Sequence, residues 1–291
     1  HESKDNATAE DIGNNNPLKQ IYLIPRSIRT EDAMKYTFID DQGEIKQNYW
    51  NRGSSNGLNP YFLINRGNNY NTRHRGITMG SLSYAFSDSF RFMVRGSYDF
   101  TFNKNESKFS KDFNSSLLNG WYSVNKNDYS LFNADFLMTY NKKITNDLSF
   151  NLNVGGNTQQ QRNHSFSANT NVGMIVPDLF TLSNTLAPAV SDSPGPEIDI
   201  QSLYSFGQIN WKNALFLDVT GRNDWSSTLP AANRSYFYPS IGLSAIVSEL
   251  IPEFPEQISF AKLWGSWAKV GSGGPAYMLA RTGRLVPGGN N

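Results

Sequence analysis

The fold is decided by an alternating stretch, Phe90-Arg91-Phe92-Met93-Val94-Arg95-Gly96-Ser97-Tyr98-Asp99-Phe100-Thr101-Phe102. The even positions are aromatic or aliphatic apart from one glycine, and the odd positions are mostly polar. A period of two is typical of a strand with one apolar and one solvated face. Strands in globular proteins usually have about 5–6 residues. An alternation more than twice as long favours a tilted strand that crosses a membrane.

The same alternation recurs along the chain and predicts eight strands in all. The clear segments besides 90–102 are residues 132–140, 148–154, 215–222 and 236–247. Weaker segments are residues 77–87, 201–211 and 258–270. No long segment has apolar residues at the i, i+3, i+4 and i+7 positions of a helix. The sequence therefore predicts an all-β protein without substantial helices.

The connections between these segments alternate in length. Short ones fall at residues 87–89, 141–146, 212–213 and 248–257, and long ones at 104–128, 164–200 and 224–235. Outer-membrane barrels have short periplasmic turns and long extracellular loops. A soluble β-sandwich is the alternative, although it rarely keeps so aromatic a face for so long. We therefore predict a transmembrane antiparallel β-barrel, in which closure pairs every backbone group away from water.

The composition excludes several classes of protein. The chain of 291 residues has no cysteine, so it forms no disulfide scaffold and no thiolate metal site. Its net charge of +1 argues against nucleic-acid binding, which needs a basic face. The chain contains no run of 18 apolar residues, so no membrane-spanning helix is predicted. Low charge and 13% aromatic residues fit long strands with a lipid-facing side.

Several segments resemble SusC/RagA-type TonB-dependent outer-membrane transporters. The main ones are Gly-Arg-Asn-Asp-Trp-Ser-Ser-Thr-Leu-Pro at 221–230, Asn-Arg-Ser-Tyr-Phe-Tyr-Pro-Ser at 233–240 and Lys-Leu-Trp-Gly-Ser-Trp-Ala-Lys-Val-Gly at 262–271. Others lie at 25–32, 59–62 (Asn-Pro-Tyr-Phe), 94–100 and 176–184. They follow one another in the family's order, which makes the resemblance specific.

The resemblance implies part of a 22-stranded barrel. The family has an N-terminal plug in the lumen and a TonB box that contacts the inner-membrane energy complex. The matching segments belong to the middle of the barrel, so the plug and the TonB box are expected to lie outside this chain. Residues 1–76 would form an extracellular loop-rich segment, 77–270 about eight strands, and 271–291 the start of a further extracellular loop.

The resemblance also implies a function. Family members actively import oligosaccharides, or in some cases peptides, across the outer membrane of Gram-negative bacteria. A SusD-like surface lipoprotein closes the barrel mouth, and the TonB complex acts on the plug. The chain would then contact outer-membrane lipid, need no cofactor and catalyse no reaction. Two alternatives are a stand-alone eight-stranded barrel with a structural or adhesive role, and a soluble secreted glycan-binding or hydrolytic β-domain.

Six residues are candidates for contact with substrate or with the lipoprotein: Trp121, Tyr122, Arg222, Asn223, Asp224 and Trp225. They are predicted to lie in or beside long loops, where aromatic rings can stack on sugars and polar groups can form hydrogen bonds. In the alternative interpretation, Trp225, Tyr236 and Tyr238 pack at the loop base or belong to the aromatic belt at the lipid interface. The run from Arg222 to Asp224 would then fix the loop.

No catalytic or metal site is predicted. The three histidines, His1, His74 and His164, are not at metal-ligand spacing and belong to no acid–base constellation. Acidic pairs such as Glu31-Asp32 and Asp40-Asp41 have the character of solvated loop charges. A pair of glycosidase carboxylates has no specific support in this pattern.

Overall fold

The computed structural model describes residues 2–5, 15–50, 57–114, 116–255, 257–271 and 273–278. His1 and most of the predicted C-terminal loop, residues 272 and 279–291, lie outside them. The chain forms two compact units. Unit 1 comprises residues 1–75, 101–129 and 163–195, and unit 2 comprises residues 76–100, 130–162 and 196–291.

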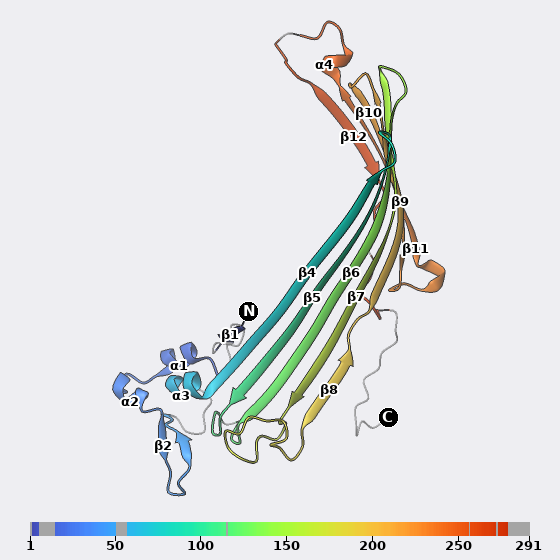
Figure 1. Cartoon of the computed structure of the whole chain (residues 1–291). Coiled ribbons are helices and arrows are strands. Elements are labelled where there is room, and N and C mark those ends of the chain that lie inside the picture. The colour runs from blue at the N-terminus through green and yellow to red at the C-terminus, as the bar shows by residue number, and fades with distance from the viewer. Residues whose placement is uncertain are drawn as a thin grey trace, which may run out of the picture. The chain divides into compact units, whose positions relative to one another are not determined.

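Most of the described chain forms a single sheet. Its order is β1-β4-β5-β6-β7-β9-β10-β11-β12, with β8 also paired to β7. Figure 1 shows β4 to β7 as neighbouring strands. The bounds are β1 (Glu2–Asp5), β4 (Gly67–Ala85), β5 (Phe90–Phe109), β6 (Trp121–Lys143), β7 (Leu148–Asn169), β8 (Ala189–Pro194), β9 (Ile198–Trp211), β10 (Leu215–Ser226), β11 (Ser235–Ile246) and β12 (Lys262–Ala268). All eight predicted strands are confirmed.

The sheet does not close in the part of the chain that the structure describes. Its strand path ends at β12, which pairs with β11, and at the other end β4 is followed only by the four residues of β1. A closed eight-stranded barrel would need β4 and β12 to pair. The stand-alone small barrel is therefore contradicted, and the sheet has the topology of a barrel segment.

The strands are longer than the alternation predicts. β6 begins at Trp121 and β7 continues to Asn169, whereas the sequence predicts loops at 104–128 and 164–200. β4 begins at Gly67, ten residues before the predicted start. Where both faces of a strand meet water, apolar and polar residues no longer alternate, so the period of two disappears. Much of each predicted long loop is consequently strand.

The predicted hairpin at Lys212-Asn213 is confirmed. Both residues have a φ of 53°, and the Ala214 N–H donates to the Trp211 carbonyl at 3.0 Å. Two consecutive left-handed residues are typical of the tight turns that match the twist of antiparallel strands. This turn fixes the register of β9 against β10, in which Leu215 faces Trp211.

That register divides the sheet into two faces. On one face of β7, β9, β10 and β11, successive cross-strand rows contain mainly apolar residues: Leu148, Trp211, Leu215 and Ala245; Phe150, Ile209, Leu217 and Leu243; Leu152, Gly207, Val219 and Ile241. The opposite face has Asn151, Gln208, Asp218 and Gly242, then Asn153, Phe206, Thr220 and Ser240. We call them the apolar face and the polar face.

The apolar face has the height of a membrane. On β7 its apolar rows run from Leu148 to Gly156, about 26 Å along the strand at about 3.3 Å per residue. A tilt of about 40° reduces this to about 20 Å, close to the apolar band of about 25 Å on transmembrane barrels. Trp211 and Trp225 lie near its two ends. This is where aromatic residues gather at lipid–water interfaces.

The all-β fold class is confirmed, and unit 1 contains in addition short helices that the sequence did not predict. They are α1 (Pro17–Leu23), α2 (Thr30–Met34) and α3 (Pro60–Arg66), near the hairpin of β2 (Thr37–Ile39) and β3 (Ile45–Gln47) (Figure 1). Unit 2 adds η1 (Ala231–Asn233) and α4 (Val247–Leu250). None of the described helices is long and apolar enough to span a membrane.

A small core holds the helices and loops of unit 1 together. It consists of the buried residues Leu58, Phe62, Leu63 and Phe113. Fully buried Gln47 connects its parts: its Nε2 donates to the Phe113 carbonyl at 2.9 Å, and its Oε1 accepts from the Asn59 N–H at 2.7 Å. The β2–β3 hairpin, the β5–β6 connection and α3 are thereby joined in a single structure.

Candidate functional site

A charged and aromatic cluster occupies the polar face of β9 and β10. The Arg222 Nε donates to Asp224 Oδ1 at 2.6 Å, and its Nη2 donates to Ser202 Oγ at 2.9 Å. Its guanidinium carbon lies 5.8 Å from the centre of the Tyr204 ring, within cation–π range. Arg222 and Asp224 are two residues apart on β10, so they share a face.

The cluster extends across β7 because Gly155 has no side chain. A Cβ on Gly155 would lie 2.6 Å from atoms of the Tyr204 ring and 2.7 Å from the Phe136 carbonyl oxygen. Beyond it, Arg95 Nε donates to Asp135 Oδ2 at 3.0 Å. On β11, the stacked rings of Tyr236 and Tyr238 lie beside Arg222 and Asp224, their cross-strand partners. We call this set the polar-face row.

The structure separates the candidate residues of β10. Arg222 and Asp224 belong to the polar-face row. Asn223 and Trp225 alternate with them and therefore lie on the apolar face. Trp225 lies one row beyond Leu203 and Phe237, and its interpretation as part of an aromatic belt stays a prediction. All four are in a strand and not in a loop.

Trp121 and Tyr122 also lie in a strand, at the beginning of β6 in unit 1. Tyr122 is buried with Val124 and Met174, and its hydroxyl donates to Glu106 Oε1 at 2.8 Å. Its ring is therefore part of a core and offers no free stacking surface. Trp121 is half-buried. The two rings thus differ in their access to a ligand.

The polar-face row includes residues that the sequence analysis missed: Arg95, Asp135, Ser202 and Tyr204. Charged residues at the polar positions of an alternating strand were a usable signal for Arg95 and Asp135. No sequence pattern identified Tyr204 as a member of the row, because its neighbours come from β7 and β10. Among the described residues, no group of three His, Asp or Glu side chains could hold a metal.

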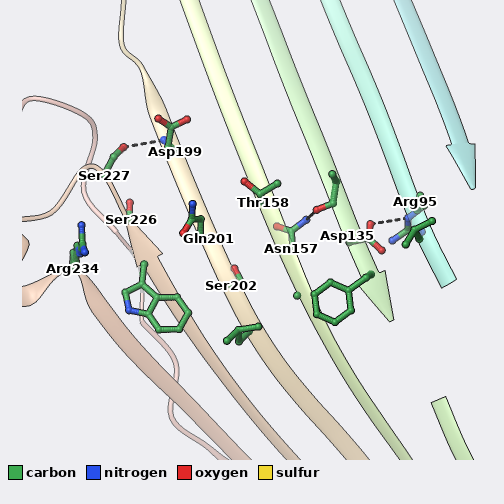
Figure 2. A pocket seen from close by; sticks show the side chains of 16 residues that line it. Arg95, Asp135, Asn157, Thr158, Asp199, Gln201, Ser202, Ser226, Ser227 and Arg234 are labelled. Carbon is green, nitrogen blue, oxygen red and sulfur yellow. Dashed lines mark hydrogen bonds and ion pairs between the residues drawn. The ribbon is translucent and has the colours of Figure 1, made fainter. Parts of the chain in front are cut away.

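A hollow of about 900 Å³ lies in unit 2, and most of its lining belongs to the apolar face. Val94, Phe136, Leu203 and Trp225 contribute apolar walls. Figure 2 shows Thr158, Gln201, Asp199, Ser227 and Arg234 around it, with dashed lines from Asp199 to Ser227 and from Arg95 to Asp135. The sheet thus has polar hydrogen-bonding groups on one face and a lipid-compatible hollow on the other.

The family is decided by a comparison of the sequence with family models. Residues 24–291 match the model described as TonB dependent receptor-like, beta-barrel. The chain belongs to this family. TonB-dependent receptor barrels are outer-membrane proteins and transporters, not enzymes. In outer-membrane barrels an apolar face contacts lipid and a polar face lines the lumen.

Solved structures of one transporter have the same fold. The chain is similar to a structure of the RagAB peptide transporter, with a TM-score of 0.67, 17% identity, and coverage of 78% of this chain and 26% of that one. The RagAB peptide importer in its closed-closed and open-open states gives TM-scores of 0.66 and 0.67, again at 17% identity and with 79% and 26% coverage. The resemblance to SusC/RagA-type transporters is confirmed in family and fold. The chain spans about a quarter of these neighbours' length, and no curated protein matches it.

Proposed function

We propose that the chain forms part of the barrel wall of a TonB-dependent importer in the bacterial outer membrane. The single observation that supports this best is the division of one strand register into an apolar face of membrane height and a polar face. A wall between lipid and an aqueous lumen needs both faces at once. A soluble glycan-binding domain has no use for the exposed apolar rows.

We propose oligosaccharides or peptides as the imported substrates. Both have many neutral hydrogen-bonding groups, and both can lie against aromatic rings. The polar-face row offers a guanidinium, a carboxylate and the stacked Tyr236 and Tyr238 rings. The neighbouring structures are described as peptide transporters, which supports peptides. Arg222 and Asp224 are the candidate substrate contacts.

We propose a SusD-like lipoprotein and the TonB complex as partners. On α1, neighbouring large apolar side chains face solvent: Tyr22 is 89% exposed, Leu18 61% and Ile21 53%. Exposed apolar residues of this size mark interaction surfaces when they gather in a patch. The lipoprotein would cover them, while TonB would act through a plug in the lumen.

The test replaces the two candidate contacts in the complete transporter. In a strain lacking the native gene, Arg222→Ala with Asp224→Ala should slow the uptake of labelled oligosaccharide or peptide mixtures while surface levels of the protein stay normal. Asn223→Ser, on the opposite face of the same strand, is the matched control and should leave uptake unchanged. The nutrient whose uptake the deletion abolishes identifies the substrate class. Uptake that continues without TonB would refute the proposal.

A further inference from the structure

The hollow on the apolar face is lined by Gly156 and by the Phe136 and Leu203 side chains that pack over it. Gly156 lies between Phe136 and Leu203, and a Cβ there would approach Phe136 Cε1 to 2.6 Å and Leu203 Cδ2 to 3.2 Å. Trp225, one strand further, provides another apolar wall. Most of the exposed lining of this hollow of about 900 Å³ is apolar, and polar side chains such as Thr158 and Gln201 also line it. Its chemistry fits an acyl chain.

A second hollow continues the first along the same face. It has about 440 Å³ and includes Leu152, Gly207, Val219 and Gly221. On β7, Leu152 is four residues from Gly156, so the two hollows follow one strand direction through the apolar band. The two hollows share no lining residue but follow one another along β7, which suits an extended hydrocarbon chain better than a compact solute; we call the pair the groove.

The upper rim of the groove is polar. Thr158 and Gln201 face each other in the row that contains Trp225. The Asp199 carboxylate is already paired with Arg162, at 2.9 and 3.3 Å, so its charge is neutralised. Arg234 also lines the hollow, and no ion pair of Arg234 occurs within the described residues. The rim therefore has one guanidinium available to an anion.

The position of the rim along the strands is that of a lipid headgroup. β10 ends at Ser226 and continues into the 227–234 connection, which contains Arg234. The tight Lys212-Asn213 turn lies at the opposite end of the same strand. Tight turns are typical of the periplasmic end of outer-membrane barrels, so the 227–234 connection lies at the outer end. Arg234 consequently sits at the interface of the outer leaflet, directly above an apolar groove.

We propose that this groove binds one outer-leaflet lipid, whose acyl chain fills the hollow beside Gly156 and whose phosphate pairs with Arg234. Hydrocarbon contact along the groove provides affinity for any lipid. The guanidinium adds a preference for anionic headgroups, worth about fivefold for one arginine near a membrane surface. The proposal requires only that the apolar face contacts lipid and does not depend on the transported substrate.

The test measures lipid retention by the complete, delipidated transporter in native mass spectrometry. Dimyristoyl phosphatidylglycerol and dimyristoyl phosphatidylcholine are the probes, since they differ only in the headgroup. The wild type should retain one phosphatidylglycerol about fivefold more strongly than phosphatidylcholine. Arg234→Gln should abolish the preference, and Thr158→Phe, which fills the mouth, should weaken retention of both lipids. Lys212→Gln is the control. It removes a cation at the other edge of the apolar band and should keep the preference for phosphatidylglycerol.

Two results would overturn the proposal. The first is equal retention of the two lipids by the wild type, or a preference that persists in Arg234→Gln. The second is evidence that a protein occupies the groove. In that case a second copy or another chain would be bound to the wild type and lost from Thr158→Phe, while lipid retention stays unchanged. Arg234 is exposed, and the substitution leaves the sheet intact, so loss of folding does not confound the first result.

Discussion

At the scale of single residues, Gly155 determines where the Tyr204 ring can lie. The ring occupies the space that a side chain on β7 would fill. In this position it makes a cation–π contact with the Arg222 guanidinium and interacts electrostatically with the Asp135 carboxylate. The cross-strand pair Gly155 and Tyr204 therefore sets the geometry of the polar-face row. Any larger residue at position 155 must displace either the ring or the backbone of β6.

Gly155→Ala should destabilise the barrel by about 1–3 kcal/mol, the usual cost of forcing an extra group into a packed position. The Phe136 carbonyl, 2.7 Å from the added Cβ, belongs to the backbone and cannot simply rotate away. Thermal unfolding of the complete protein in detergent, followed by its heat-dependent shift on gels, measures the effect. Gly96→Ala is the matched control, since its Cβ would meet nothing within 4 Å. Equal melting temperatures for the two variants would contradict the close packing.

The sequence pointed to only part of the polar-face row. Arg222 and Asp224 stood out because they lie in a recognisable segment. The alternation of β10 also settles that they share a face and that Trp225 does not. The packing of Tyr204 over Gly155 depends on the pairing of β7 with β9, strands separated by residues 170–197. No local pattern contains that information.

At the scale of elements, the helices of unit 1 depend on their caps. α3 has seven residues and begins at Pro60, with Asn59 as its N-cap. The Asn59 Oδ1 accepts from the Tyr61 N–H at 2.9 Å, and its Nδ2 donates to the Ala33 carbonyl at 2.9 Å. Such short helices have too few turns for a period of 3.6 residues to be visible. The Asn-Pro pair was the available sequence signal for the start of the helix.

Asn59→Ala should destabilise α3 by about 1–3 kcal/mol, since it removes the cap and leaves buried backbone groups without partners. Hydrogen exchange of residues 57–66 in the complete protein should become faster by the factor to which this loss of stability corresponds. Asn16→Ala provides the comparison: Asn16 caps α1 in a less buried position and should cost about 1 kcal/mol or less. If α3 exchanged at its original rate in the Asn59 variant, the role of the cap would be wrong.

The tip of the β2–β3 hairpin should be held in place at unusually low pH. Hydrogen bonds from Lys111 and then Lys46 lower the pKa of Glu44 from 4.5 to about 2. A lowered carboxyl pKa stabilises the folded state above pH 4.5, and this contribution is lost as the pH falls towards 2. Hydrogen exchange of residues 37–47, corrected for the intrinsic rate, should therefore show protection at pH 3.5.

Lys111→Gln tests the cause of this resistance. Without its first partner, the pKa of Glu44 should rise, and the hairpin should lose protection at a higher pH than in the wild type. Lys46 is retained in this variant, so a partial shift is expected. Identical pH profiles for the wild type and Lys111→Gln would mean that the Glu44–Lys111 contact does not hold the hairpin.

At the scale of the whole molecule, the two faces of the sheet belong to opposite environments. Alternation in the sequence predicted all eight main strands because lipid on one side and water on the other impose a period of two. The same cause explains the underestimated strand lengths. Residues 157–169 of β7, mostly polar on both faces, lie beyond the apolar band and contain no such signal.

The most direct test of the two faces is a cysteine scan along β10 of the complete transporter in lipid bilayers. This chain has no cysteine of its own, and any cysteine elsewhere in the transporter is first replaced by serine, so each introduced thiol carries the single spin label. Labels at Leu217 and Val219 should be accessible to oxygen dissolved in lipid, and labels at Asp218 and Thr220 to a water-soluble nickel reagent. We expect this alternation, with a period of two residues, from Leu217 to Thr220. Equal accessibility at all four positions, or the reverse alternation, would contradict it.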